Sequence, residues 1–82
     1  MNIHERAVVG EITSIERLRP SVNGNPRYRF TIDGKNYFSS SDSMFVYEVG
    51  NPGYRVGCIV CCQLTKAGRI RYMEPSPTSK WR

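Results

Sequence analysis

The chain has 82 residues, a formal net charge of +5 and a hydrophobic fraction of 39%, which together allow one domain with a single small core. No apolar run approaches the roughly 20 residues of a membrane-spanning helix, and the N-terminal residues lack the pattern of a signal peptide. We therefore expect a cytoplasmic protein without membrane contact, whose basic balance favours an acidic partner such as nucleic acid or an acidic protein surface.

The first expected element runs from about Ala7 to Arg19. Its apolar residues recur at spacings of four, three and three, as Val8, Ile12, Ile15 and Leu18. That spacing taken alone is typical of a helix face, whereas the β-branched composition favours a strand. A long strand that bends at Gly10 and carries a bulge near Thr13-Ser14 would satisfy both observations, so we favour the strand and keep the helix as the alternative.

A loop from Pro20 to Pro26 precedes the clearest strand, in which inward and outward residues alternate over residues 27–33. Asp33-Gly34 is a favoured pair for a two-residue hairpin turn. We therefore predict an antiparallel hairpin over residues 27–39 that buries one face of its first strand, with Tyr28, Phe30 and Ile32 pointing inward.

After a polar loop, Ser41 or Asp42 could cap one or two helical turns over Met44 to Val49. The run from Val56 to Thr65 is apolar on both faces, as in a central strand covered on both sides. A turn at residues 66–68 then leads to a last strand from Arg69 to Glu74.

We expect one domain over residues 1–75 and a flexible basic tail over residues 76–82, which has no packing pattern. Five short strands with a short helix between the third and fourth match the element order of a five-stranded OB-fold barrel. The predicted fold class is therefore all-β, a small OB-like barrel, and an SH3-like barrel is the nearest alternative.

The middle of the chain, from about Gly10 to Ile70, carries a characteristic series of short segments. They are Ser21-Val22-Asn23-Gly24-Asn25-Pro26-Arg27-Tyr28-Arg29-Phe30, Asp33-Gly34-Lys35-Asn36-Tyr37 and Leu64-Thr65-Lys66-Ala67-Gly68-Arg69-Ile70. In this pattern the chain resembles a group of small phage-encoded accessory proteins without an assigned role. The resemblance implies a mobile-element origin and a host-cell location, and it supplies no catalytic residue.

Three cysteines, Cys58, Cys61 and Cys62, lie in the apolar run and form a C-x-x-C motif there. Within a strand, positions three apart point to opposite faces, so both sulfurs would not converge on one zinc ion. We expect reduced, metal-free and mostly buried thiols. The only histidine, His4, lies near the N-terminus, and no serine or carboxylate has a recognisable catalytic partner. We therefore expect neither an enzyme nor a cofactor.

Arginine and aromatic residues form the strongest candidate site. Arg27 and Arg29 lie on the outward face of the second strand, and Arg69 and Arg71 lie opposite Ile70 and Tyr72 in the last strand. If both faces lie on one side of the barrel, the four guanidinium groups form a stripe along which a nucleic-acid backbone could run. The rings that could stack on bases are Tyr37, Phe38, Tyr47 and Tyr54.

Two functions of different classes follow from this composition. The first is a non-enzymatic module that binds single-stranded nucleic acid through the arginine and aromatic face. The second is a phage effector that binds and inhibits a host protein of defence or replication, because arginine and tyrosine also dominate protein-interface hot spots. A solvated barrel surface with the aromatic residues in the core is the plain structural alternative.

Overall fold

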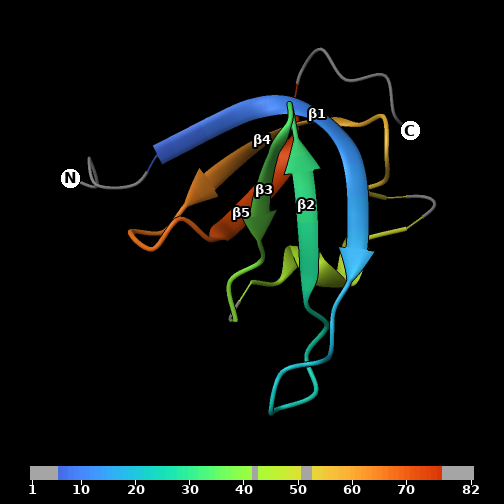
Figure 1. The fold of residues 1–82 in the computed structure, drawn as a ribbon, viewed down its shortest axis with the longest axis vertical. Coiled ribbons are helices and arrows are strands. Elements are labelled where there is room, and N and C mark those ends of the chain that lie inside the picture. The colour runs from blue at the N-terminus through green and yellow to red at the C-terminus, as the bar shows by residue number, and fades with distance from the viewer. Residues whose placement is uncertain (1–5, 42, 51–52, 77–82) are drawn as a thin grey trace.

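The computed structural model describes residues 6–41, 43–50 and 53–76, and their regular structure is almost entirely β-sheet (Figure 1). The elements in chain order are β1 (Arg6–Arg17), β2 (Tyr28–Ile32), β3 (Lys35–Phe38), the single 3-10 turn η1 (Phe45–Glu48), β4 (Ile59–Leu64) and β5 (Ile70–Pro75). All pairings between these strands are antiparallel, and the strands form one sheet in the order β3-β2-β1-β4-β5. The predicted all-β class, with five strands and a short helical turn after the third, is confirmed.

The first element is the predicted bent strand and not a helix. Figure 1 shows β1 as a long arch, and its first half pairs with β4 while its second half pairs with β2. The pairing register with β2 shifts between Ile12 and Ser14, which is where the bulge was expected. Ile12 is fully buried and Ile15 packs against the core. The helix-like spacing in the sequence thus arises because the bulge changes which residues of β1 face inward.

The hairpin of β2 and β3 is confirmed with its predicted turn. Asp33 and Gly34 both have positive φ angles, 50° and 86°, as a two-residue hairpin turn requires. Tyr28, Phe30 and Ile32 are buried, and the residues between them are half-buried. The alternation of apolar and polar residues in the sequence therefore places the inner and outer faces of β2 correctly.

The edge strands β3 and β5 approach each other through one parallel bridge between Ser39 and Ile70. The backbone N–H of Ser40 also donates to the Ile70 carbonyl, at 2.9 Å. Within the described residues no strand ladder joins β3 to β5, so the sheet is curled, and closure into a complete OB-like or SH3-like barrel stays a prediction.

The core lies on the inner face of this curled sheet. Its buried residues come from β1, β2, β4, β5, η1 and the loop before β4: Ile12, Tyr28, Phe30, Ile32, Phe45, Val46, Tyr54, Cys58, Val60, Cys62, Leu64, Ile70 and Met73. The ring of Phe30 lies at the centre, 5.9 Å from the Tyr28 ring and 5.7 Å from the Phe45 ring. The turn η1 therefore holds its place by burying Phe45 and Val46, since Met44 at its start makes no side-chain cap and Asp42 lies outside the described residues.

The cover of β4 and the position of Ser76 differ from those expected. One face of β4 is buried, but its other face is only half-buried at Ile59 and Cys61 and exposed at Gln63. The strand is thus covered on one side, because the described part of the chain provides no second layer over its outer face. Ser76, expected to begin the tail, is buried and donates its N–H to the Ile59 carbonyl; residues 77–82 lie outside the described residues. Among the described residues there is no helix of the length and apolarity that crossing a membrane would take.

Gly10 in β1 lies directly beneath the hairpin turn. A Cβ atom there would overlap the Asp33 carboxylate and approach the Ile32 Cγ2 atom to 2.8 Å. That carboxylate accepts a hydrogen bond from the backbone N–H of Glu11, at 3.1 Å. The bend of β1 and the hairpin turn are therefore packed against each other at a position where only glycine fits.

We predict that Gly10→Ala destabilises the protein by about 1–3 kcal/mol, the usual cost of an added group in a packed site. Intrinsic strand preference alone would give the opposite sign, because alanine loses less conformational freedom than glycine. The free energy of unfolding, measured in urea, tests this. Val9→Thr, at the exposed neighbouring position, is the control and should change it by less than about 0.5 kcal/mol. An unchanged or higher stability for Gly10→Ala would contradict the packing described.

Candidate functional site

The outer face of β1, β2 and β3 carries a transverse row of three side chains. Glu16 pairs with Arg29 across β1 and β2, and Arg29 pairs with Phe38 across β2 and β3, so the three side chains share one face. The Arg29 guanidinium lies 2.6 Å from the Glu16 carboxylate. The Phe38 ring is 42% exposed, which is unusual for phenylalanine. This row places a neutralised arginine beside an open aromatic surface.

Arg69 extends the row from the turn between β4 and β5. Its backbone is held by Thr65, whose N–H donates to the Arg69 carbonyl at 2.8 Å and whose hydroxyl accepts the Arg69 N–H at 3.2 Å. The guanidinium carbon of Arg69 lies 5.9 Å from the centre of the Phe38 ring, within the range of a cation–π contact. The Ser39–Ile70 bridge makes this contact possible, because it brings the end of β3 next to the start of β5.

A cavity of about 420 Å³ opens beside this contact. It is lined by Arg27 and Arg69 and by five small residues, Ser21, Val22, Ser39, Ser40 and Ser41. The walls are fixed by local hydrogen bonds: the Ser39 hydroxyl accepts the Tyr28 N–H at 3.2 Å, and the Ser21 hydroxyl accepts the Asn25 N–H at 3.1 Å. Two guanidinium groups among serine hydroxyls and backbone groups suit an anion with several oxygen atoms, such as a phosphate. We call this the serine cavity.

Arg71 and Tyr72 do not lie as the sequence pattern predicts. Strict alternation places Tyr72 on the face opposite Arg71, which is the core side in the plain structural alternative, but Tyr72 is 57% exposed. The register of β4 and β5 shifts so that Gln63 pairs with Tyr72 and Leu64 with Ile70, which leaves Arg71 as the extra residue of a bulge. Both side chains therefore face outward, with the Arg71 guanidinium carbon 5.6 Å from the centre of the Tyr72 ring.

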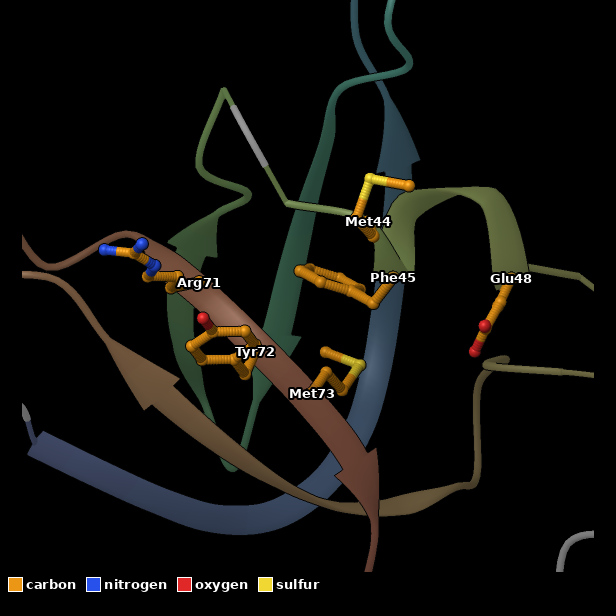
Figure 2. A pocket seen from close by; sticks show the side chains of 6 residues that line it. All are labelled: Met44, Phe45, Glu48, Arg71, Tyr72 and Met73. Atoms are coloured by element: carbon orange, nitrogen blue, oxygen red, sulfur yellow. The ribbon is translucent and has the colours of Figure 1, made fainter.

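A second cavity of about 300 Å³ lies between η1 and β5 (Figure 2). Figure 2 shows Phe45 and Met73 at its centre, Arg71 and Tyr72 along β5 on one side and Glu48 on the opposite side. Met44 forms the rim and is 74% exposed. We call this the β5 cavity. The four arginines expected in one stripe are thus divided, since Arg27 and Arg69 line the serine cavity and Arg71 lines the β5 cavity.

The remaining candidate rings have different environments. Tyr37 is half-buried and packs against the core, whereas the Tyr47 ring is exposed and its hydroxyl donates to the Asn25 side chain at 2.6 Å. Tyr54 is buried, packs edge-on against Phe45 and donates its hydroxyl proton to the Met73 carbonyl at 2.7 Å. The expectation of a contact ring at Tyr54 is therefore wrong, because this tyrosine is a core residue that links the loop before β4 to β5.

The cysteines lie in and beside β4. Cys58 and Cys62 are buried, and Cys61 is half-buried on the outer face. Burial raises the pKa of the Cys62 thiol to about 12, with a further contribution from Cys61, so Cys62 is protonated at neutral pH and a poor nucleophile. Within the described ranges, no group of three or more metal-ligating side chains could hold a metal ion.

Sequence reasoning missed two parts of the site. The serine run after β3 reads as an ordinary polar loop, and only its position next to basic residues could have marked it as a cavity wall. The Glu16 carboxylate had no signal at all, because its partner Arg29 is a cross-strand neighbour. Searches against protein-family models, curated proteins and solved structures find no match for this chain.

Tyr54 provides a test of the packing beneath the β5 cavity. Burial and the nearby Glu48 carboxylate raise its pKa from 10.0 to about 12. A raised pKa contributes stability that is complete below pH 10.0, where the unfolded tyrosine is also protonated, and that is lost as the pH rises towards about 12.

We predict that Tyr54→Phe lowers the free energy of unfolding at neutral pH by about 1–3 kcal/mol, because the Met73 carbonyl loses its buried donor. The difference between wild type and variant should then shrink as the pH rises above 10.0, since only the wild type loses the Tyr54 contribution. Urea unfolding at a series of pH values measures both effects. A difference that stays constant with pH would show that Tyr54 titrates normally. The Cys62 contribution is common to both proteins and cancels.

Proposed function

We propose that this chain is a non-enzymatic accessory domain of a phage or mobile element that binds single-stranded nucleic acid through the serine cavity and the adjoining outer face of β2 and β3. The observation that carries the proposal is the convergence of Arg27 and Arg69 on one cavity, with the exposed Phe38 ring beside Arg69. These three side chains come from three different parts of the chain, and the curled sheet brings them together.

The chemistry of single-strand binding matches this arrangement. A nucleic-acid strand presents a phosphate at every nucleotide, and between phosphates it presents the flat face of a base. The serine cavity offers charge-assisted donors for a phosphate, and Phe38 offers a ring surface at the edge of that cavity. A contact of this kind depends little on sequence, because phosphates are identical and every base has a π face.

Arg29 adds a feature that moderates the affinity. In the free protein its charge is balanced by the Glu16 carboxylate 2.6 Å away. A phosphate approaching Arg29 must therefore compete with Glu16, and it meets electrostatic repulsion from that carboxylate. Arg27 and Arg69 then provide most of the attraction, while Arg29 contributes less than its position on the face would allow.

The first test is the affinity for a labelled single-stranded oligonucleotide over a series of salt concentrations. With two or three arginine–phosphate contacts, the logarithm of affinity should fall with the logarithm of salt with a slope of about −1.4 to −2. Arg69→Ala should weaken binding to all sequences about equally and reduce the slope by about 0.7. Lys35→Ala removes the same charge at the far end of β3 and is the matched control, with a smaller loss of affinity.

A folded protein without oligonucleotide affinity at low salt would refute this function. The arginine face would then be a candidate surface for a host protein, the alternative that the composition also suggests. Capture from nuclease-treated host lysate, compared between wild type and Arg69→Ala, separates that outcome from a protein without any partner.

A second prediction concerns the ion pair. Glu16→Gln removes the carboxylate and leaves Arg29 free to bind phosphate, so affinity should rise several-fold at low salt and the slope should steepen by up to about 0.7. The same substitution should change the free energy of unfolding by less than about 1 kcal/mol, because both side chains of the pair are partly exposed. Glu11→Gln, on the other half of β1, controls for net charge. If both variants gain affinity equally, the effect is one of total charge and Arg29 makes no contact.

A further inference from the structure

Because of the bulge in β5, two consecutive side chains, Arg71 and Tyr72, are both exposed and both line the β5 cavity. A regular strand would have placed Arg71 and Tyr72 on opposite faces, with the ring in the core. The register shift opposite Gln63 and Leu64 instead exposes both. Strand bulges often re-aim a side chain next to a binding site. The exposed Tyr72 ring lines a cavity, and the Arg71 guanidinium carbon lies 5.6 Å from the centre of that ring.

We propose that the β5 cavity is a nucleotide subsite, in which Tyr72 stacks on one base of the bound strand and Arg71 binds the adjacent phosphate. This inference rests on the proposed function, and it extends the binding path beyond the serine cavity. Phe45 and Met73 form an apolar floor suited to the flat face and edge of a base, and the thioether of Met44 can pack on it from the rim (Figure 2).

Charge determines how a nucleotide would lie in this cavity. Figure 2 shows Arg71 and Glu48 on opposite sides of the apolar floor. The phosphate is attracted to the Arg71 side and repelled from the Glu48 side, so the base points across Phe45 towards η1. The carboxylate of Glu48 can then accept a hydrogen bond from a base amino group.

The lining residues of the two cavities lie close together along the chain. Arg69 lines the serine cavity and Arg71 lines the β5 cavity, and two residues of chain span at most about 7 Å of backbone. That spacing is comparable to one nucleotide step of an extended single strand. The segment between β3 and η1 separates the cavities, since Ser39, Ser40 and Ser41 line one of them and Met44 and Phe45 line the other. A nucleic-acid strand that passes over this segment would place successive phosphates at Arg69 and Arg71.

The side of the Tyr72 ring on which the base stacks can also be assigned. Tyr72 and Met73 line a third cavity, of about 330 Å³, on the outer face of β4 and β5. The described residues that line it are Ala7, Cys61, Gln63, Tyr72, Met73 and Glu74, which include one carboxylate and no basic side chain. A phosphate would be repelled there, so the strand takes the side of Tyr72 that faces Arg71 and Met44.

The experiment compares an oligonucleotide with an all-abasic phosphodiester strand of the same length. Tyr72→Ala should weaken the intact strand about tenfold, the usual effect of losing one stacked base, without changing the salt slope. It should leave the abasic strand unchanged, because that strand binds through phosphates alone. Tyr72→Phe retains the ring and should restore intact-strand affinity to near that of wild type. Arg71→Ala should weaken both strands and lower the slope by about 0.7.

A matched pair of charge variants tests which side of Tyr72 is used. Met44→Glu places a carboxylate on the rim of the β5 cavity and should weaken binding about tenfold, whereas Gln63→Glu places the same charge in the third cavity and should have a much smaller effect. Both positions are exposed, so folding can be checked for each by its thermal unfolding.

The outcomes separate the two proposals. If wild type binds and Tyr72→Ala loses nothing, or loses equally on the intact and abasic strands, the subsite is refuted and the proposed function stands. Equal effects of Met44→Glu and Gln63→Glu would likewise refute this assignment of the cavity. If wild type binds neither strand at low salt, both proposals fail.

Discussion

The fold depends on β1, which forms antiparallel pairings with two different strands. β1 uses residues 6–11 to pair with β4 and residues 12–17 to pair with β2, and it turns between them at Ile12. The bend is fixed from both sides: Ile12 donates its N–H to the Cys58 carbonyl and accepts the Gly57 N–H, each at 2.8 Å. Gly10 allows the Asp33 turn to pack against the same stretch. Because β1 bends, the sheet curls and has an inner face on which β1, β2, β4, β5 and η1 bury one core.

The same curl creates the candidate site. Once the two halves of the sheet face each other, the end of β3 meets the start of β5, and the Ile70 carbonyl accepts hydrogen bonds from the Ser40 N–H and the Ser43 hydroxyl. This buried carbonyl ties the serine segment to β5. Arg69 is carried next to Phe38 and Arg27 as a consequence. The site is thus a product of the single contact between the two edges of the sheet, and it requires no ladder between the edge strands.

The arginines of the two candidate sites have different electrostatic environments. Arg29 is balanced by Glu16, Arg69 lies against a ring, and Arg71 lies against another ring and faces a cavity whose far side holds Glu48. The net charge of +5 therefore overstates the attraction of this face for an acidic partner. Cation–π contacts leave the guanidinium donors available for hydrogen bonds, whereas an ion pair occupies them. Arg69 and Arg71 are for this reason available to a phosphate. The proposals also depend on Arg27, which lines the serine cavity and donates one guanidinium N–H to the Arg19 carbonyl at 3.4 Å.

Alternation and turn chemistry in the sequence were sufficient to predict the β2–β3 hairpin, the outward direction of Arg29 and the all-β class, because period-two patterning and the Asp33-Gly34 turn are local properties. The bend of β1 was also predictable, from Gly10 and the change of apolar phase at Ile12. Tertiary structure alone decided the rest. Tyr72 was expected on the face opposite Arg71 and Tyr54 on the surface, and neither lies so: a bulge opposite β4 turns Tyr72 out, and packing against Phe45 with a hydrogen bond to Met73 draws Tyr54 in. Neither event has a local signature, because a bulge and a buried hydroxyl partner are properties of two segments in contact.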